Sequence, residues 1–107
     1  MQQLSVTQLK AWLDDPAREK PVLLDVREQR ELDIARLDGA VHIPMATIPV
    51  RQAELDRDSD IVVVCHHGGR SMHVAMFLER LGFDRVHNLA GGVDAWARQV
   101  DTSMATY

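Results

Sequence analysis

The chain has 107 residues, of which 46% are hydrophobic, 26% charged and 5% aromatic. This length suits one domain with an aliphatic core, and the composition excludes a disordered, collagen-like or coiled-coil protein. The net charge is −4 and no basic run occurs, which argues against a nucleic-acid partner. We therefore expect one domain over residues 1–107, with its core over about 4–100 and a loosely held tail over 101–107.

Cysteine is used once, at Cys65, so an intrachain disulfide and a cysteine-rich zinc site are both excluded. The first ten residues show no charged-then-apolar signal segment. The longest apolar run, Ile61–Cys65, is far shorter than the ~20 residues of a membrane span. We expect a cytoplasmic protein in a reducing compartment, without a membrane partner.

Short apolar runs alternate with segments of helical period along the chain. The runs are rich in Val and Ile and nearly continuous, which is typical of parallel strands buried on both faces. Near the start, Ser5 and Gln8 form a capping-box pattern, and a brief strand over residues 4–6 is the competing interpretation. The predicted elements, in chain order, are a helix capped by Ser5, a strand over Val22–Val26, a helix over Glu28–Ile34, a strand over Ala40–Ile43, a helix over Ile48–Leu55, a strand over Ile61–Cys65, a helix over Ser71–Leu81, a strand over Val86–Leu89 and a helix after Gly91-Gly92.

The helix after Cys65 has the clearest pattern, because Val74, Phe77, Leu78 and Leu81 lie on one face and Gly82 follows as a left-handed end. Strands that alternate with helices predict an α/β domain with right-handed crossovers and helices on both faces of a parallel sheet. In such sheets, ligands bind beyond the carboxyl ends of the strands.

One strand end carries unusual chemistry, because Cys65 is followed by a turn and a helix start. Gly68 and Gly69 permit positive φ angles that turn backbone N–H groups toward one centre. The helix start near Arg70 and Ser71 adds unpaired N–H groups and a partial positive charge. These features favour a thiolate at Cys65 and hence a cysteine nucleophile, whereas a lone cysteine at a strand end is more often a small buried hydrophobe.

The spacing from Cys65 to Arg70 separates two kinds of cysteine chemistry. Four residues lie between them, whereas phosphate-transferring cysteine enzymes use a Cys-x5-Arg loop. A shorter loop makes a tighter cradle, which suits a terminal sulfur on the cysteine better than a phosphoryl group. The spacing therefore favours sulfur transfer.

Two further groups flank this loop in the predicted fold. Asp25 and Arg27 lie at the end of a strand, where they could orient the loop. Alternatively they belong to a structural ion pair, for which Glu31 is a possible partner of Arg27 because the two are at helical spacing. The structural interpretation is favoured. His66 and His67 are expected to line the mouth of the site and make it mildly electropositive, or to carry protons. No metal site is expected, because no carboxylate lies at a suitable spacing from these histidines.

With these motifs in place, the sequence resembles the rhodanese family, and specifically its small single-domain members. The motifs that carry the resemblance are Leu24–Glu28, Glu31-Leu32, Gly39-Ala40 with Ile43-Pro44, the loop Cys65–Ser71, and Leu89–Gly92 with Trp96. The resemblance implies a central five-stranded parallel sheet and a thiosulfate sulfurtransferase type of activity. One departure is Ala35-Arg36-Leu37, which stands where family members often have Gly-His-Ile and leaves the local loop geometry open.

The family's chemistry passes through a cysteine persulfide on Cys65. A small anionic sulfur donor such as thiosulfate would load it, and a thiol, cyanide or a sulfur-relay protein would accept the sulfur. The resemblance implies that backbone N–H groups of His66, His67, Gly68, Gly69, Arg70 and Ser71 hold the persulfide. Arg70 would hold the anionic donor, Ser71 would cap the helix or add a donor, and no cofactor is required.

Two other functions stay open at this point. The first is a persulfide carrier that receives sulfur from a partner protein. The second, less favoured, is a cysteine-dependent phosphatase or arsenate reductase, against which the lone cysteine counts because no intrachain thiol would resolve a reductase cycle. A monomer is the default for a complete small sheet, although edge strands also pair in some proteins.

Overall fold

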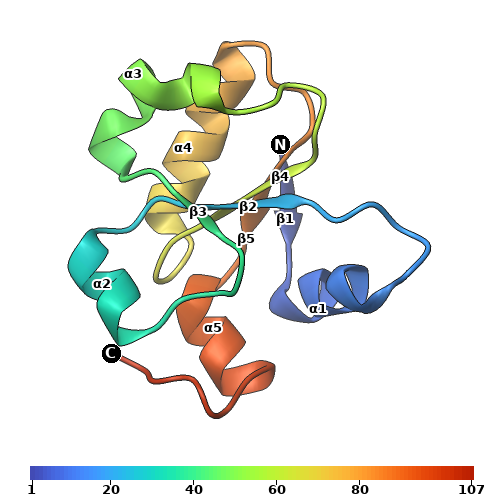
Figure 1. The fold of residues 1–107 in the computed structure, drawn as a ribbon, viewed down its shortest axis with the longest axis vertical. Helices are drawn as coiled ribbons and strands as arrows, with labels where there is room; N and C mark the ends of the chain where they lie inside the picture. Colours follow the sequence, from blue (N-terminus) through green and yellow to red (C-terminus); the bar gives the residue numbers. More distant parts are fainter.

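Five parallel strands form the centre of the fold in the computed structural model, which describes residues 1–107 (Figure 1). The strands are β1 (Gln2–Leu4), β2 (Val22–Asp25), β3 (Val41–His42), β4 (Ile61–Val64) and β5 (Val86–Leu89). Their order across the sheet is β1-β5-β4-β2-β3, and every neighbouring pair is parallel. The expected α/β class and the five-stranded parallel sheet are confirmed, with β4 in the middle.

The helices cover both faces of this sheet, as expected. They are α1 (Val6–Asp14), α2 (Gln29–Ile34), α3 (Ile48–Arg51), α4 (Gly69–Arg80) and α5 (Gly92–Gln99), with short 3-10 turns η1 (Met45–Thr47) and η2 (Gln52–Glu54) on either side of α3. Figure 1 shows α3 and α4 on one side of the strands and α1 and α5 on the other. None of these helices has the length and apolar character needed to cross a membrane.

The central strand explains why the sequence shows unbroken apolar runs. Ile61 and Val63 belong to a cluster of 13 buried residues on the α3 and α4 side. Val62 and Val64 belong to a cluster of 11 buried residues on the α1 and α5 side. Because each face of β4 packs against its own core, neither face tolerates polar side chains.

At the start of the chain, a short strand comes before the capped helix. Residues Gln2–Leu4 form a strand that pairs with β5. The competing interpretation of residues 4–6 as a strand is wrong, because the strand ends at Leu4 and Val6 is the first residue of α1. Ser5 then caps α1: its Oγ accepts the backbone N–H of Gln8 at 3.1 Å, and the Gln8 side chain accepts the backbone N–H of Ser5 at 2.8 Å. The predicted capping box is confirmed.

The helix after Cys65 begins two residues earlier than predicted. Gly68 adopts a left-handed φ of 103° and acts as the N-cap, so Gly69 is already the first helical residue. The helix ends at Arg80, and Gly82 has the expected left-handed conformation with a φ of 95°. Leu81, predicted to face inward, is 36% exposed because it lies beyond the last helical turn.

Candidate active site

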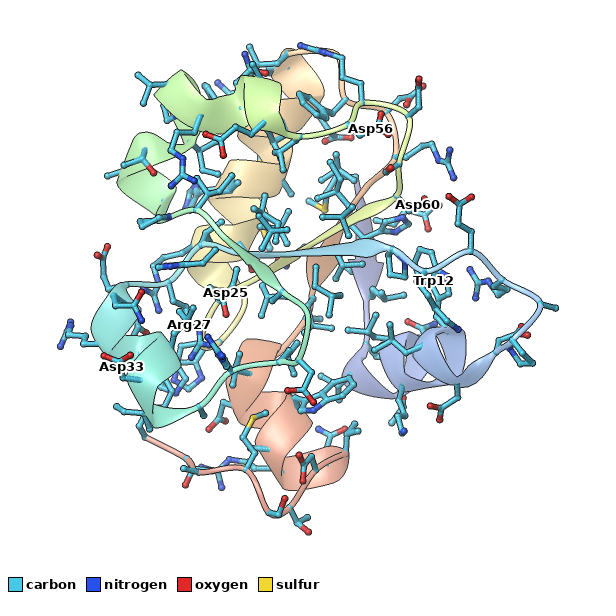
Figure 2. All side chains as sticks on the ribbon, viewed as in Figure 1. Trp12, Asp25, Arg27, Asp33, Asp56 and Asp60 are labelled. Atoms are coloured by element: carbon cyan, nitrogen blue, oxygen red, sulfur yellow. The ribbon has the colours of Figure 1, made fainter.

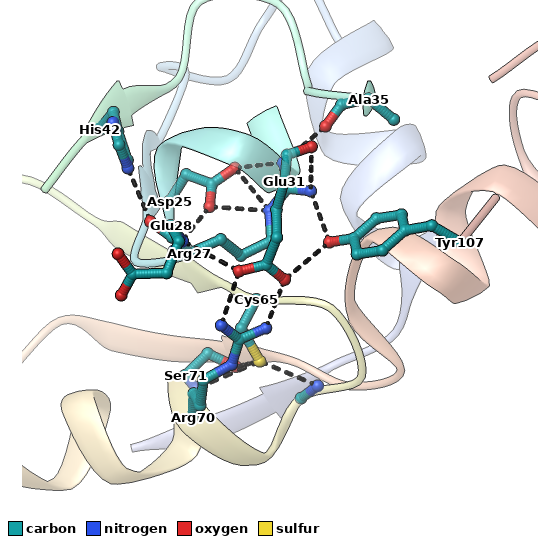
Figure 3. Close-up of polar contacts among 11 residues, drawn as sticks. Asp25, Arg27, Glu28, Glu31, Ala35, His42, Cys65, Arg70, Ser71 and Tyr107 are labelled. Carbon is teal, nitrogen blue, oxygen red and sulfur yellow. Dashed lines mark hydrogen bonds and ion pairs between the residues drawn. The ribbon is translucent and has the colours of Figure 1, made fainter. Parts of the chain in front are cut away.

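The sulfur of Cys65 lies at the carboxyl end of β4, where the chain turns into α4. Cys65 is 1% exposed. Its Sγ accepts the backbone N–H groups of Gly68 at 3.1 Å and Ser71 at 3.3 Å, and it lies 3.3 Å from the Ser71 hydroxyl (Figure 3). Backbone N–H groups directed at a sulfur stabilise negative charge on that sulfur.

The same loop offers further hydrogen-bond donors. Four other backbone N–H groups between Cys65 and the second residue of α4 have no acceptor in the protein, and they belong to His66, His67, Gly69 and Arg70. Only Gly68 of the two loop glycines has a positive φ, so the expectation that Gly69 shares this conformation is wrong. The left-handed cap at Gly68 alone is enough to start the helix here.

The N-terminus of α5 fixes this loop through two backbone hydrogen bonds. Val93 donates its backbone N–H to the Cys65 carbonyl at 2.9 Å, and Asp94 donates to the His66 carbonyl at 3.0 Å. Gly92 makes this approach possible, because a Cβ at that position would lie 2.3 Å from the Cys65 carbonyl oxygen. The sequence predicted a strand-to-helix turn at Gly91-Gly92, and the structure shows that this turn also holds the loop.

A buried amide supports the sulfur cradle from β5. Asn88 is 1% exposed, and its Oδ1 accepts the hydroxyl hydrogen of Ser71. Its Nδ2 donates to the Gly68 carbonyl at 3.2 Å and to Gln3 Oε1 at 2.9 Å. No sequence motif pointed to Asn88, although an amide within a strand expected to be buried on both faces was an available signal.

Asp25 and Arg27 form a fully buried ion pair at the end of β2 (Figure 2). Arg27 Nη2 lies 2.8 Å from Asp25 Oδ2, and both side chains are 0% exposed. Arg27 also donates to the Ala35 carbonyl at 2.8 Å, so the pair fixes the segment after α2. The structural ion pair favoured from the sequence is present, but the suggested partner Glu31 is wrong, because Arg27 pairs with Asp25 and reaches only the backbone carbonyl of Glu31.

Glu31 instead pairs with Arg70, the last charged residue of the loop. The two guanidinium nitrogens Nη1 and Nη2 donate to Oε2 and Oε1 of Glu31, each at 2.8 Å (Figure 3). The hydrogen bond from Arg70 lowers the pKa of Glu31 from 4.5 to about 2, although burial acts in the opposite direction. These residues are 39 positions apart in the chain, so no local pattern predicted their contact.

The two loop histidines lie against the end of the chain. The His66 ring stacks on Tyr107 with a centroid distance of 3.8 Å and an interplanar angle of 5°, and it contacts His67 at 3.8 Å. Burial, and then the charge of His67, lower the pKa of His66. The tail that was expected to be loosely held therefore supplies a side chain to the mouth of the site.

A carboxylate also approaches the histidines, contrary to the prediction from spacing. Potential ligand atoms of His66, His67 and Asp94 lie within 4.8 Å of one another, since α5 brings Asp94 beside the loop. Asp94 is at the same time paired with Arg98 at 3.0 Å. Sequence spacing did not indicate this approach because α5 begins more than twenty residues after the loop.

The segment Ala35-Arg36-Leu37 departs from the family pattern. The residues on both sides of the arginine are nevertheless buried in the core. Ala35 and Leu37 are 9% and 5% exposed and belong to the cluster beneath α1 and α5. Arg36 is exposed and borders a cavity of about 430 Å³ between this segment, α1 and α5. The cavity does not include any residue of the loop after Cys65.

Together, the fold and the loop define a class of protein. It is a parallel α/β domain whose central strand places a buried cysteine in a loop of backbone N–H donors at the carboxyl edge of the sheet. Residues 5–99 match the rhodanese-like domain, and the chain belongs to the rhodanese family. The resemblance drawn from the sequence motifs is confirmed.

Known relatives share this domain over most of the chain. The putative sulfurtransferase YtwF of Bacillus subtilis is 38% identical over 96 residues, which cover 90% of each protein. The thiosulfate sulfurtransferase GlpE of Actinobacillus succinogenes is 36% identical over 93 residues, covering 87% of this chain and 83% of the relative. The chain is thus homologous to small sulfurtransferases.

Longer relatives and solved structures agree on the fold. The chain is 37% identical over 109 residues to the Rhodanese-like/PpiC domain-containing protein 12, chloroplastic, of Arabidopsis thaliana, and spans 36% of the length of that relative. The crystal structure of a rhodanese-like domain protein from Staphylococcus aureus matches with a TM-score of 0.84 at 29% identity, covering 100% of this chain and 99% of that one.

Proposed function

We propose that this protein is a sulfurtransferase that carries a sulfane sulfur on Cys65 as a persulfide. The observation that carries the proposal is the donor set around the Cys65 sulfur. Gly68 and Ser71 donate backbone N–H groups to it, and four more N–H groups of the same loop have no acceptor. A persulfide adds a second sulfur with a negative charge, which these unpaired donors would hold.

The reaction divides into two steps at Cys65. The thiolate attacks the sulfane sulfur of the donor, the donor's S–S bond breaks, and the leaving group departs with the bonding electrons, as sulfite when the donor is thiosulfate. An acceptor nucleophile, such as cyanide or a thiol, then attacks the outer sulfur of Cys65–S–S⁻ and regenerates the thiolate. This order predicts ping-pong kinetics.

The surrounding residues hold the loop rather than react. Asn88 fixes Ser71 and Gly68, while the buried pair of Asp25 and Arg27 stabilises the segment beside the loop. The pairing of Arg70 with Glu31 weakens the case for a phosphatase, since phosphoryl transfer uses such an arginine to hold a phosphate dianion.

The proposal is tested by the intact mass of the protein after incubation with a panel of sulfur donors. Loading adds one sulfur atom, or about 32 Da, and the chain has one cysteine to receive it. Oxidation of two of the five methionines would add nearly the same mass. Brief treatment with cyanide or dithiothreitol distinguishes these adducts. Both reagents remove the outer sulfur of a persulfide, and a brief treatment with either one leaves methionine sulfoxide unchanged.

We expect Cys65→Ser to lose both the removable adduct and the production of thiocyanate from cyanide. Ser59→Ala is the matched control, because Ser59 lies in an exposed turn and its hydroxyl contacts Asp56, away from the loop. The proposal is wrong if the wild-type protein gains no removable sulfur from any donor of the panel, which should include thiosulfate and a small hydropersulfide.

A further inference from the structure

The positive charge of Arg70 at the mouth of the site is already paired with a carboxylate of the protein. Arg70 is the loop cation that an anionic donor would meet, and its side chain is 38% exposed. Both of its terminal nitrogens are engaged by Glu31 in a bidentate contact with two distances of 2.8 Å. A bidentate arginine–carboxylate pair is a strong and directional contact, and it uses the same guanidinium edge that would grip an oxyanion.

Glu31 is held in place by groups other than Arg70. Its Oε2 accepts the backbone N–H of Glu28 at 2.9 Å, which closes the capping box of α2. Its Oε1 accepts the hydroxyl of Tyr107 at 3.0 Å, and that hydroxyl in turn accepts from Arg27 at 2.8 Å. Because these contacts fix the carboxylate independently, Glu31 would keep its position if Arg70 turned toward a ligand.

Two other arginines near the loop are paired as well. Arg27 is fully buried against Asp25, and Arg98 contacts Asp94 at 3.0 Å. Burial lowers the pKa of His66, which disfavours a positive charge on this ring. A dianion that enters the mouth thus meets the unpaired backbone N–H groups of the loop beside a paired arginine and the fixed carboxylate of Glu31.

From this arrangement, and resting on the sulfurtransferase function proposed above, we infer that Glu31 selects the class of sulfur donor. The site takes sulfur from persulfides of thiols, which bring at most one negative charge to the reacting end, in preference to the thiosulfate dianion. The transfer is Cys65–S⁻ + R–S–SH → Cys65–S–SH + R–S⁻. The S–S bond of the donor breaks, the new S–S bond forms on Cys65, and the thiolate R–S⁻ leaves with the electron pair.

The test compares the rates at which Cys65 is loaded by sodium thiosulfate and by hydroxyethyl hydropersulfide, followed by intact mass. Each rate constant is divided by the rate constant of the same donor with free N-acetylcysteine, a thiol that differs from the leaving thiol of either donor, which removes the intrinsic reactivity of the donor. For the wild-type protein we expect the normalised rate constant to be larger for the hydropersulfide. An equal or larger normalised value for thiosulfate would overturn the inference, whatever the variants show.

Glu31→Gln then frees Arg70 while keeping the size of the side chain. We expect the ratio of thiosulfate loading to hydropersulfide loading to rise roughly fivefold to tenfold, the scale of one partly solvated charge pair. The rise should shrink at high salt, since the freed charge is partly exposed. Adding Arg70→Gln to Glu31→Gln should remove the rise, because the arginine is then no longer there to bind the dianion.

The control is Glu54→Gln, which removes the same charge from an exposed Arg51–Glu54 pair on α3 and η2. The ratio should stay at the wild-type value in this variant, so an equal rise there would overturn the inference by showing a general charge effect. An unchanged ratio in Glu31→Gln, with Cys65 still loaded by the hydropersulfide, overturns the inference and leaves the sulfurtransferase proposal standing. Failure of these two donors and of every other donor of the panel to load wild-type Cys65 overturns the sulfurtransferase proposal itself.

Discussion

Asp25 and Arg27 form a buried contact whose loss we expect to destabilise this small domain. Both side chains are 0% exposed, so neither charge is solvated by water when its partner is removed. We expect Asp25→Asn to lower the free energy of unfolding by about 3–5 kcal/mol, the usual cost of leaving one charge of a buried pair uncompensated. Urea denaturation monitored by circular dichroism measures this change.

Glu54→Gln serves as the comparison for this measurement, because it breaks an arginine–glutamate pair that water reaches freely. Its effect on stability should be much smaller than that of Asp25→Asn. Similar losses in the two variants would mean that the buried pair is no more important to the fold than a surface contact.

The carboxylate of Glu31 makes the free energy of unfolding depend on pH. Its pKa is about 2 in the folded protein against 4.5 for the unperturbed group, so the folded state binds its proton more weakly. The stabilisation is therefore fully present above about pH 4.5 and is lost as the pH falls toward 2. We expect Glu31→Gln to be less stable than the wild-type protein by about 1–3 kcal/mol at pH 7, with the difference shrinking over that acidic window.

This prediction is measured by unfolding both proteins in denaturant at several pH values between 2 and 7. A stability difference that stays constant across this range would show that the carboxylate charge is not what Glu31 contributes. A difference that grows on acidification would contradict the direction of the pKa shift.

At the scale of elements, the contact between α5 and the active-site loop depends on Gly92. Its φ is 60°, and a Cβ there would lie 2.3 Å from the Cys65 carbonyl and 2.5 Å from the His66 carbonyl. Gly92→Ala would therefore push the loop away from α5, and we expect it to lower the rate of Cys65 loading by tenfold or more, the scale set by small displacements of catalytic groups. The loading rate is measured by intact mass.

Gly39→Ala is the matched control, since Gly39 has a similar φ of 75° but no atom within 4 Å of the position of an added Cβ. It should cost about 1–2 kcal/mol of stability from backbone strain alone and leave the loading rate close to that of the wild-type protein. If Gly39→Ala slows loading as much as Gly92→Ala, the loss comes from general destabilisation and not from the displaced loop.

Elements defined by local chemistry were predictable from the sequence. The capping box of Ser5 and Gln8 depends on residues three positions apart, and the buried β4 follows from a run of β-branched residues. The start of α4 was placed two residues late, because the sequence does not show which of two glycines takes the left-handed conformation. Predicted helix 48–55 divides into α3 and a 3-10 turn, a difference that apolar spacing does not resolve.

The sequence did not predict which charged side chains of the site pair with one another, because these contacts depend on the fold. Three carboxylates, those of Asp25, Glu28 and Glu31, lie within four residues of Arg27, and helical spacing suggested Glu31 as its partner. In the fold, Arg27 pairs with Asp25, and Glu31 pairs with Arg70. Asn88 and Tyr107 reach the site only because β5 and the tail are brought beside it by the fold. The cysteine loop was recognisable because its chemistry lies in seven consecutive residues.

At the scale of the whole molecule, the tail and the active-site loop are joined through Tyr107. Figure 1 shows the C-terminus beside α2, and the Tyr107 hydroxyl bonds Arg27 and Glu31 while its ring lies on His66. We expect Tyr107→Ala to expose His66 and to raise its pKa toward the usual histidine value, because burial is the largest cause of the lowered pKa. A titration of the histidine resonances by NMR measures this change.

Tyr107→Phe separates the hydroxyl from the ring. It keeps the stacked ring and should leave the pKa of His66 close to that of the wild-type protein, while costing roughly 1 kcal/mol of stability from the lost hydrogen bonds. If the pKa of His66 is the same in all three proteins, the tail does not shield the mouth of the site in solution.

The burial of Cys65 bears on how long the protein would keep a sulfur atom once it has one. Because the thiol is 1% exposed and enclosed by residues 66–71, only an acceptor that fits the mouth of the site would reach the stored sulfur. The half-life of the stored atom would then depend on the shape and charge of the acceptor as well as on its strength as a nucleophile. Such a protein would keep its sulfur in the presence of reductants that fit the mouth poorly and release it to an acceptor that enters it.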